Sequence, residues 1–332
     1  MTPVRKNHRT LGYAAALAVV TAGLIAAPPQ SARAQAQVPK TVRILVPFPA
    51  GGPTDTAARV SSEQIGKLHG ISFVIENRVG GGSAIASEAA ARATPDGGTL
   101  LVVAGALLIN PILKKLNYDP LLSFEPICKL VRVPHFIVVN KDSPLKSFAD
   151  FIAAARARPG ELTFATVGPA TGPHIAFETL KRRGSVDVRF VPYPGTTPSI
   201  NAVLGGHVAV AMGDFRDVIG ALQGGLLRGL ATTAPARLEQ LPDIPTVAEL
   251  GYPGYEAESF FGLVAPAGTP KETMTQLTTW VSAALQDADV RSKLVNAGLF
   301  PTGVCGTEFA AHLRQQHEHY VQAIREANIQ AQ

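Results

Sequence analysis

The sequence predicts an α/β protein with two lobes and a ligand-binding cleft between them. Short β-branched runs alternate with amphipathic stretches over residues 42–104, and a second set of such units begins near residue 140. After about residue 255 the pattern becomes mainly helical, which indicates that the chain returns to complete the first lobe. The length of 332 residues fits two domains of about 100–200 residues each.

The first set of units alternates strands with helices. We expect strands at 42–46, 73–76 and 100–104, and helices at 54–68 and 83–93. The segment Thr94-Pro95-Asp96-Gly97 ends the second helix, because proline and glycine interrupt helical structure. Strand–helix–strand order implies a parallel sheet with helices on both faces.

The second set begins with a helix that Ser147 caps and Pro159-Gly160 ends. Strands follow at 162–166, 188–191, 208–212 and 227–231, with helices at 174–183 and 198–204. A last strand at 261–264 precedes helices at 271–285, 288–297 and 307–327. We therefore assign residues 38–140 and 255–332 to lobe one and residues 141–254 to lobe two. Two chain crossings between such lobes leave a cleft, where small molecules usually bind.

The first 34 residues have the pattern of a secretory signal peptide. Arg5, Lys6 and Arg9 precede an uncharged, mostly apolar stretch at 11–27, and Ala32-Arg33-Ala34 is a small-x-small cleavage site. The alternative, an N-terminal membrane anchor, is open because the apolar stretch is near the lower spanning limit of about 17 residues. We expect cleavage after residue 34 and export to the periplasm.

The net charge argues against a polyanionic partner. The formal charge is +5, but the segment 1–34 holds four bases and no acid, which leaves 26 bases against 25 acids in the mature chain. No basic run with interleaved aromatic residues follows, so we expect no nucleic-acid binding.

Cys128 and Cys305 are the two cysteines, and they lie far apart in the sequence. In an oxidising compartment they either pair or stay free, and the sequence does not supply the Cα separation that a disulfide requires. We expect two buried free thiols. Neither cysteine lies in a Cys-x-x-Cys motif or beside a histidine, which disfavours thiol chemistry.

Glycine-rich loops between a strand and a helix recur at 49–55, 80–83, 167–174 and 194–197. Glycines allow close approach of a ligand to the backbone, and the free N–H groups at a helix N-terminus attract an anion. Any one of these loops is also explained as a tight turn. None matches a nucleotide-binding fingerprint, so the predicted anion is small, such as a carboxylate, and no cofactor is expected.

No catalytic signature is present, and we expect no enzymatic activity. His312, His317 and His319 are interpreted as the polar face of a helix rather than a metal site. His174, at the start of a helix, either donates to a ligand or packs locally. Asp55 and Asp214 precede or open helices, where they either cap backbone N–H groups or orient groups around a ligand.

A series of short motifs occurs in a fixed order along the mature chain. These are Val46-Pro47-Phe48-Pro49-Ala50-Gly51-Gly52-Pro53-Thr54-Asp55, Glu76-Asn77-Arg78-Val79-Gly80-Gly81-Gly82, Thr94-Pro95-Asp96-Gly97, Ile109-Asn110-Pro111, the loop 168–174, Val191-Pro192-Tyr193, Leu204-Gly205-Gly206-His207-Val208, the segment 241–249 and the segment 261–270. With these motifs the chain resembles the Bug-type, TctC-like extracytoplasmic substrate-binding proteins of tripartite tricarboxylate transporters.

The resemblance implies a two-lobed, periplasmic-binding-protein-like fold of type II with two Rossmann-like lobes. It implies capture of a small carboxylate by lobe closure and delivery to integral-membrane permease subunits, without cofactor or metal. We expect a monomer. The ligand-binding residues that it implies are Phe48, Gly51, Gly52, Thr54, Asp55, Ala170, Thr171, His174 and Asp214.

Two departures from the family pattern affect the expected site. Phe260 stands where the family often has tryptophan, so we expect it to form an aromatic wall of the cleft with less area. Arg216 follows Asp214 where the family often has other residues. We include Arg216 among the ligand-binding residues, because an arginine suits a second carboxylate, with a surface role as the alternative.

Two other functions are also compatible with the sequence. One is an exported α/β enzyme acting on a small carboxylate, with His174 and Asp214 as an acid–base pair. The other is a ligand sensor that docks on a two-component kinase. The sequence does not distinguish aliphatic from aromatic ligands, or monocarboxylates from dicarboxylates.

Overall fold

The computed structural model describes residues 1–2 and 37–330. The predicted signal peptide and its cleavage site therefore lie, but for Met1 and Thr2, outside the described residues. Within the described part of the chain, no helix is both long enough and apolar enough to span a bilayer.

One group of strands, called sheet A here, forms the first half of the fold. Its strands are β1 (Thr41–Val46), β2 (Ser72–Asn77), β3 (Thr99–Val103), β9 (Glu258–Pro266), β10 (Phe300–Pro301) and the first part of β4 (Phe124–Asn140). β1 pairs in parallel with β2 and β3, as predicted. β9 lies antiparallel between β3 and β4, so the sheet is mixed rather than all parallel.

A second group, called sheet B, contains β5 (Thr163–Val167), β6 (Arg189–Tyr193), β7 (Val210–Asp214), β8 (Leu227–Thr232) and the last part of β4. β5 pairs in parallel with β6 and β7, whereas β7 and β8 both lie antiparallel to β4. Sheet B is therefore also mixed, again because of the long strand β4.

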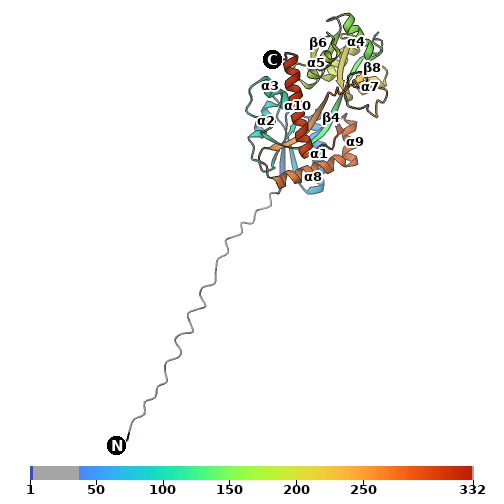
Figure 1. The fold of residues 1–332 in the computed structure, drawn as a ribbon. Helices are drawn as coiled ribbons and strands as arrows, with labels where there is room; N and C mark the ends of the chain where they lie inside the picture. Colours follow the sequence, from blue (N-terminus) through green and yellow to red (C-terminus); the bar gives the residue numbers. More distant parts are fainter. Residues whose placement is uncertain (3–36, 331–332) are drawn as a thin grey trace. The chain divides into compact units, whose positions relative to one another are not determined.

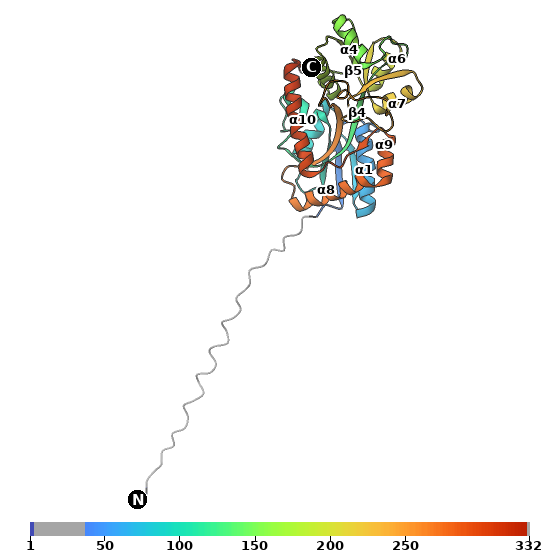
Figure 2. The same ribbon diagram turned by 45° about the vertical axis from the view of Figure 1, so that its right-hand side comes forward.

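β4 joins the two sheets, and it runs through both halves of the fold in Figure 2. Its pairing with β9 extends to Pro134, and from His135 onward its partners are β7 and β8. The chain returns from sheet B to sheet A in the segment just before β9. Thr233 forms two hydrogen bonds with this segment. The Thr233 hydroxyl donates to the Ala257 carbonyl at 2.5 Å, and the Ala257 N–H donates to the Thr233 carbonyl at 3.0 Å.

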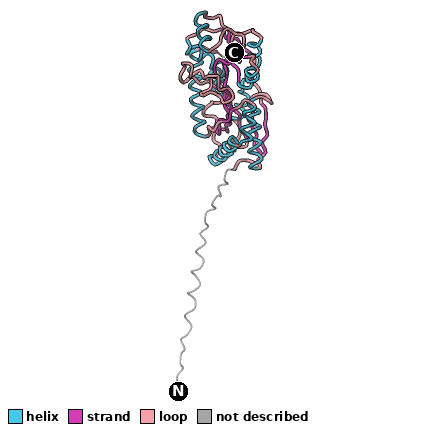
Figure 3. The backbone as a smooth tube through the Cα atoms, turned by 90° about the vertical axis from the view of Figure 1, so that its right-hand side faces the viewer, coloured by secondary structure: helices cyan, strands magenta, loops and turns pink. Residues whose placement is uncertain are grey.

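Helices cover both faces of each sheet, and Figures 1 and 3 show them on either side of the strands. Sheet A packs against α1 (Pro53–His69), α8 (Lys271–Gln286) and α9 (Ala288–Asn296) on one face, and against α2 (Ala84–Ala91), α3 (Gly105–Leu113) and α10 (Gly306–Glu326) on the other. Sheet B packs on one face against α4 (Phe148–Ala157) and α5 (Gly172–Gly184), and on the other face against α6 (Thr196–Leu204) and α7 (Phe215–Gln223).

Successive side chains of a strand face opposite sides of the sheet, and this alternation places the core clusters on opposite faces. In β4, Ile137 and Val139 pack toward α4 and α5, whereas Phe136 and Val138 pack toward α6 and α7. This follows from the period of two in a strand, which sends successive side chains to opposite faces. A strand that is buried on both faces reads as a continuous apolar run, as residues 136–139 of β4 do.

The sequence did not predict α3, which follows β3 directly. Pro111 lies inside this helix, and a proline has no N–H to donate to the carbonyl four residues earlier. The Tyr118 hydroxyl donates to that carbonyl, on Leu107, at 3.3 Å. A tertiary contact thus replaces the hydrogen bond that local sequence removes.

The expectation of two free thiols was wrong, because Cys128 and Cys305 form a disulfide. Cys128 lies in β4, and the segment after β10 runs antiparallel beside it. The Lys129 N–H donates to the Val304 carbonyl at 2.8 Å, which brings the two cysteines opposite each other. This pairing depends on residues that are 177 positions apart, so local sequence does not reveal it.

Breaking the Cys128–Cys305 bond should lower the free energy of unfolding by about 2–4 kcal/mol, because the closed loop restricts the unfolded chain. The measurement is urea unfolding with and without reductant. In a Cys128→Ala/Cys305→Ala control, the reductant should have no effect. Two titratable thiols in the denatured, unreduced protein would contradict the disulfide.

Candidate functional site

A cleft of about 820 Å³ lies where loops of sheets A and B meet. Its lining comes mainly from loops at the carboxyl ends of strands, together with α3, β9 and α10. The lining residues are Phe48, Pro49, Ala50, Gly51, Gly52, Pro53, Thr54, Gly82, Ala104, Gly105, Ala106, Ile109, Asn110, Leu113, Lys114, Val167, Pro169, Ala170, Thr171, Gly172, Pro194, Gly195, Thr196, Asp214, Ser259, Phe261 and Tyr320. Carboxyl ends of strands are the usual ligand site of open α/β sheets.

The starts of five helices border this cleft. Residues at the N-caps or first turns of α1, α3, α5, α6 and α7 are among its lining. The first N–H groups of a helix have no partner within it and carry partial positive charge. In four of the five helices no side chain caps these groups, α5 being the exception. The cleft therefore offers several backbone donors to an anion.

Hydrogen bonds to the Asp55 carboxylate stabilise the loop before α1. Asp55 Oδ2 accepts from the Gly51 N–H at 3.0 Å and from Arg59 Nε at 2.8 Å. Asn77 Nδ2 donates to Asp55 Oδ1 and to the Phe48 carbonyl, both at 3.0 Å. These bonds fix a turn in which Gly51 has φ +77°, a conformation that favours glycine.

Asp55 is 2% exposed and does not line the cleft, so it shapes the loop rather than facing a ligand. Burial alone raises the pKa of its carboxyl. The hydrogen bonds from Arg59, the Gly51 N–H and Asn77 outweigh burial and lower that pKa below its usual value. Asp55 therefore stays ionised, with its charge facing Arg59 rather than the cleft.

Thr54 is a buried polar residue in the first turn of α1. It lines the cleft and is 3% exposed, and its Oγ1 has no hydrogen-bond partner. A buried hydroxyl without a partner costs free energy, so such a group is uncommon unless something binds there. No side chain caps the N–H groups of the helix turn to which Thr54 belongs.

The loop before α5 is fixed by Thr171 and His174. The Thr171 hydroxyl donates to the Gly168 carbonyl at 2.8 Å and accepts from the His174 N–H at 3.4 Å. His174 Nδ1 accepts from the Ala170 N–H at 3.3 Å, which holds Ala170 at φ +59°. The ring of His174 stacks on Phe190 with centroids 4.3 Å apart.

Of the three predicted site residues in this loop, Ala170 and Thr171 line the cleft and His174 does not. Burial, with a smaller effect of Lys181, lowers the pKa of the His174 imidazole to about 4. A neutral imidazole suits its bond to Ala170, because Nδ1 must be unprotonated to accept. The structure thus favours the packing alternative for His174.

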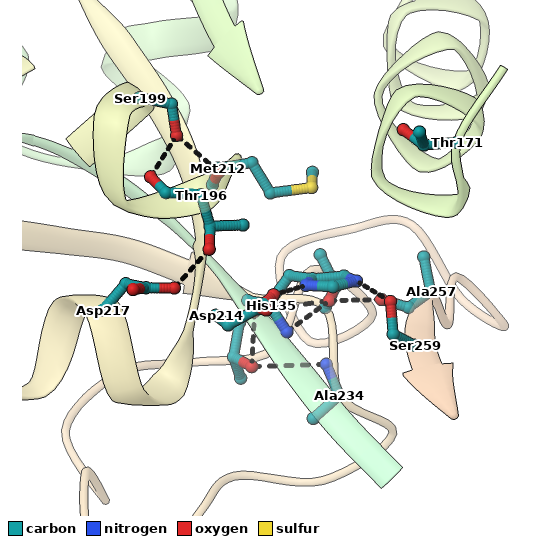
Figure 4. Close-up of polar contacts among 12 residues, drawn as sticks. His135, Thr171, Thr196, Ser199, Met212, Asp214, Asp217, Ala234, Ala257 and Ser259 are labelled. Carbon is teal, nitrogen blue, oxygen red and sulfur yellow. Dashed lines mark hydrogen bonds and ion pairs between the residues drawn. The ribbon is translucent and has the colours of Figure 1, made fainter. Parts of the chain in front are cut away.

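Asp214 meets His135, not His174. Asp214 Oδ1 is 2.7 Å from His135 Nδ1, and the Ser259 Oγ is 3.2 Å from His135 Nε2. Figure 4 shows His135 between these two side chains. Asp214 occupies the N-cap position of α7 without capping it, so the predicted pairing with His174 and the predicted capping role are both absent.

Asp214 and Ser259 line the cleft, whereas His135 is 1% exposed. His135 lies at the point where β4 passes from sheet A to sheet B. Its ring therefore ties the end of β7 to the start of β9 and fixes one oxygen of the Asp214 carboxylate.

Arg216 and Phe260 do not line the cleft. Arg216 is exposed, and a Cβ built on Gly298 would lie 2.9 Å from its Cβ, which places it against the loop after α9. Phe260 is 2% exposed and packs edge-on against Phe309 in the core. Its neighbour Phe261 lines the cleft instead, because adjacent residues of a strand face opposite sides.

Several cleft residues escaped the sequence prediction. No sequence pattern indicated a binding role for Lys114, Tyr320, Ser259 or the start of α3, although the Ile109-Asn110-Pro111 motif lies within that helix. Tyr320 is 5% exposed, and its hydroxyl lies 3.0 Å and 3.9 Å from Cβ atoms built on Gly105 and Gly172. Burial raises the Tyr320 pKa to about 12, so the hydroxyl remains a donor.

A second hollow of about 540 Å³ contains Arg156, Lys181 and Arg182, but its cations already have partners. Lys181 Nζ is 3.3 Å from Glu178 Oε1, Arg182 pairs with Glu326, and Arg156 donates to the Gly184 carbonyl at 2.7 Å. The cleft is thus the better anion site. No group of three or more His, Cys, Asp or Glu within the described residues is placed to hold a metal ion.

The pKa of His174 predicts an effect of pH on stability. In the unfolded chain the imidazole titrates near its ordinary value of 6.5, and in the folded chain near 4. As pH falls from about 6.5 to 4, the unfolded state binds a proton that the folded state excludes, so the free energy of unfolding falls.

His174→Asn keeps an acceptor for the Ala170 N–H but does not titrate. It should reduce the slope of unfolding free energy against pH by up to about 1.4 kcal/mol per unit in this window. Urea unfolding at a series of pH values measures the slope. His312, whose pKa burial also lowers to about 4, titrates in both proteins and cancels. The exposed His207→Asn control should match the parent, and an unchanged slope in His174→Asn would contradict the prediction.

Several solved structures with this fold are 30% identical to this chain or more, and three of them follow. The periplasmic binding protein BugD is 30% identical with a TM-score of 0.72, covering 88% of this chain and 99% of BugD. R. palustris Rpa4515 with adipate is 33% identical with a TM-score of 0.75, covering 87% and 98%. MatC (Rpa3494) from Rhodopseudomonas palustris with bound malate is 30% identical with a TM-score of 0.69, covering 86% and 98%.

These likenesses identify the fold as the predicted two-lobed, periplasmic-binding-protein-like fold of type II. The predicted resemblance to Bug-type, TctC-like proteins is confirmed by the family model described as "Tripartite tricarboxylate transporter family receptor", which matches residues 57–329. The chain therefore belongs to the tripartite tricarboxylate transporter receptor family.

Proposed function

We propose that this protein is a periplasmic solute-binding receptor that captures a small carboxylate in the cleft and delivers it to the permease subunits of a tripartite tricarboxylate transporter. It acts as a monomer after removal of residues 1–34. Related proteins whose solved structures hold adipate and malate support the carboxylate as ligand class.

The observation that carries this proposal is the convergence of helix starts from both sheets on one cleft, with the unpartnered Thr54 hydroxyl among them. A carboxylate has two oxygens with about four lone pairs and matches such a set of donors. Donors from both sheets engage together only when the cleft is occupied. The ligand itself therefore links the two halves.

We assign the moving units to the lobes expected from the sequence, 38–140 with 255–332 and 141–254. The hinge then lies at two crossings. These are the change of partners in β4 at Pro134 and His135, and the segment before β9 that Thr233 holds. Closure about these crossings brings the loops before α1 and α5 toward each other, with the ligand between them.

Replacing Thr54 by valine tests the site. Thr54→Val removes the unpartnered hydroxyl without orphaning another group, so the free energy of unfolding should change by no more than about 1 kcal/mol. Affinity for a carboxylate should fall about tenfold, because a hydrogen bond to a charged group is lost. The ligand is chosen from a thermal-shift panel of carboxylates, and calorimetry measures its affinity.

Thr179→Val is the matched control. Thr179 is also buried, at 4% exposure, and its hydroxyl also lacks a partner, but it lies in α5 away from the cleft. Its substitution should leave carboxylate affinity unchanged. Equal effects of the two variants on binding would remove Thr54 from the site, and a thermal shift with no carboxylate of the panel would overturn the ligand class.

A second candidate function is acyl transfer, and the Ser259–His135–Asp214 arrangement favours it. The two distances, 3.2 Å and 2.7 Å, match the nucleophile–base–carboxylate order of serine hydrolases. In such a step Ser259 Oγ would attack an ester carbonyl and pass its proton to His135 Nε2. The proton then goes to the leaving alkoxide, and water hydrolyses the acyl-enzyme.

Ester turnover separates the two functions. A binding protein should return its carboxylate ligand unaltered and show no release of nitrophenol from nitrophenyl esters. Release that continues beyond one equivalent and disappears in Ser259→Ala would establish the enzyme. Release that persists in Ser259→Ala would come from another source and would not support acyl transfer at this site.

A further inference from the structure

Tyr320 brings a side chain of the long helix α10 to the cleft. Its ring belongs to the same apolar core cluster as Phe260 and Phe309, and the residue is 5% exposed. Tyr320 nevertheless lines the cleft. A ring that is packed against the core holds its hydroxyl in place, so little freedom is lost when a ligand binds to it.

The Tyr320 hydroxyl differs from the hydroxyls of the other buried tyrosines. Tyr118 donates to the Leu107 carbonyl at 3.3 Å, and Tyr255 donates to the Ala176 carbonyl at 2.9 Å. The Tyr320 hydroxyl has no hydrogen-bond partner within the described residues. A buried tyrosine hydroxyl usually has a partner, so this one is available to a molecule that enters the cleft.

The position of the hydroxyl relates it to one helix start from each half of the fold. Gly105 is the first residue of α3, and Gly172 is the first residue of α5. A Cβ built on Gly105 would lie 3.0 Å from the Tyr320 oxygen, and one built on Gly172 would lie 3.9 Å from it. Neither glycine has a positive φ, so the backbone alone does not require glycine there. The close approach of the hydroxyl gives a reason for glycine at position 105.

We propose that the Tyr320 hydroxyl donates a hydrogen bond to the bound carboxylate, between the starts of α3 and α5. The proposal rests on the proposed carboxylate receptor and adds a side chain of α10 to its site. The phenol stays neutral at physiological pH, because burial raises its pKa to about 12. A neutral phenol has one hydrogen to donate and no charge to repel an anion.

Tyr320→Phe removes the hydroxyl and keeps the packed ring. Affinity for the carboxylate should fall about tenfold, because a hydrogen bond to a charged group is lost. The melting temperature without ligand should not fall, since no protein group loses a partner. Calorimetry with the mature protein measures the affinity for acetate, malate, adipate and benzoate. The probe for the variants is the carboxylate of these four that binds wild type most tightly.

Tyr255→Phe is the matched control and should show the opposite pattern. Tyr255 is 2% exposed and does not line the cleft. Its substitution leaves the Ala176 carbonyl without the tyrosine donor, so the melting temperature should fall. Affinity for the same carboxylate should stay unchanged.

Gly105→Ala tests where the hydroxyl lies. The added Cβ displaces the Tyr320 oxygen, so this variant should also bind the carboxylate more weakly than wild type. In the Tyr320→Phe background, Gly105→Ala should have little further effect, because the displaced atom is already absent. Equal losses in both backgrounds would contradict the placement of the hydroxyl at Gly105.

The outcomes distinguish this inference from the receptor proposal. A loss of affinity in Tyr320→Phe but not in Tyr255→Phe supports the hydrogen bond. If Tyr320→Phe binds as tightly as wild type, or if both tyrosine variants lose affinity equally, the role of Tyr320 is wrong while the carboxylate receptor stands. If none of the four carboxylates binds wild type, the receptor proposal itself falls, and this inference with it.

Discussion

The unpaired N–H groups at the first turns of helices are the constraint on which this site depends. Each helix leaves such donors unsatisfied, and the topology brings five helix starts to one cleft. The chain leaves them uncapped at four of these starts, and it leaves the Thr54 hydroxyl without a partner beside one of them. A small anion satisfies these groups at once, and a cofactor or nucleophile is not needed for that task.

The loops that present these donors are held by side chains that face away from the cleft. Asp55 with Asn77 fixes the loop before α1, and His174 fixes the loop before α5. His135 fixes one oxygen of the Asp214 carboxylate. Rigid loops matter because donors that are already in place bind a ligand without a cost of ordering. Strand β4 carries His135, so the same residue lies at the site and at the change of partners between the sheets.

Sequence patterns predicted most strands and helices, because periodicity and glycine or proline punctuation are local. They also predicted the loops at Gly51 and Ala170 as parts of the cleft, where the structure places them. Three features depended on distant residues and were not predictable. The mixed sheets arise from β4 and β9, the Leu107 carbonyl of α3 accepts from the Tyr118 hydroxyl, and the disulfide needs the segment after β10 beside β4.

The direction of the side chains was the other feature that the sequence did not predict. Motifs place Asp55 and His174 in two loops that border the cleft, but only the folded structure shows that neither side chain lines it. The most direct test of this site is a crystal structure of the mature protein with its tightest-binding carboxylate. We expect a carboxylate oxygen within hydrogen-bond distance of Thr54 Oγ1 and of N–H groups at the starts of helices from both sheets. A carboxylate seated elsewhere, such as against Arg156 and Lys181, would contradict it.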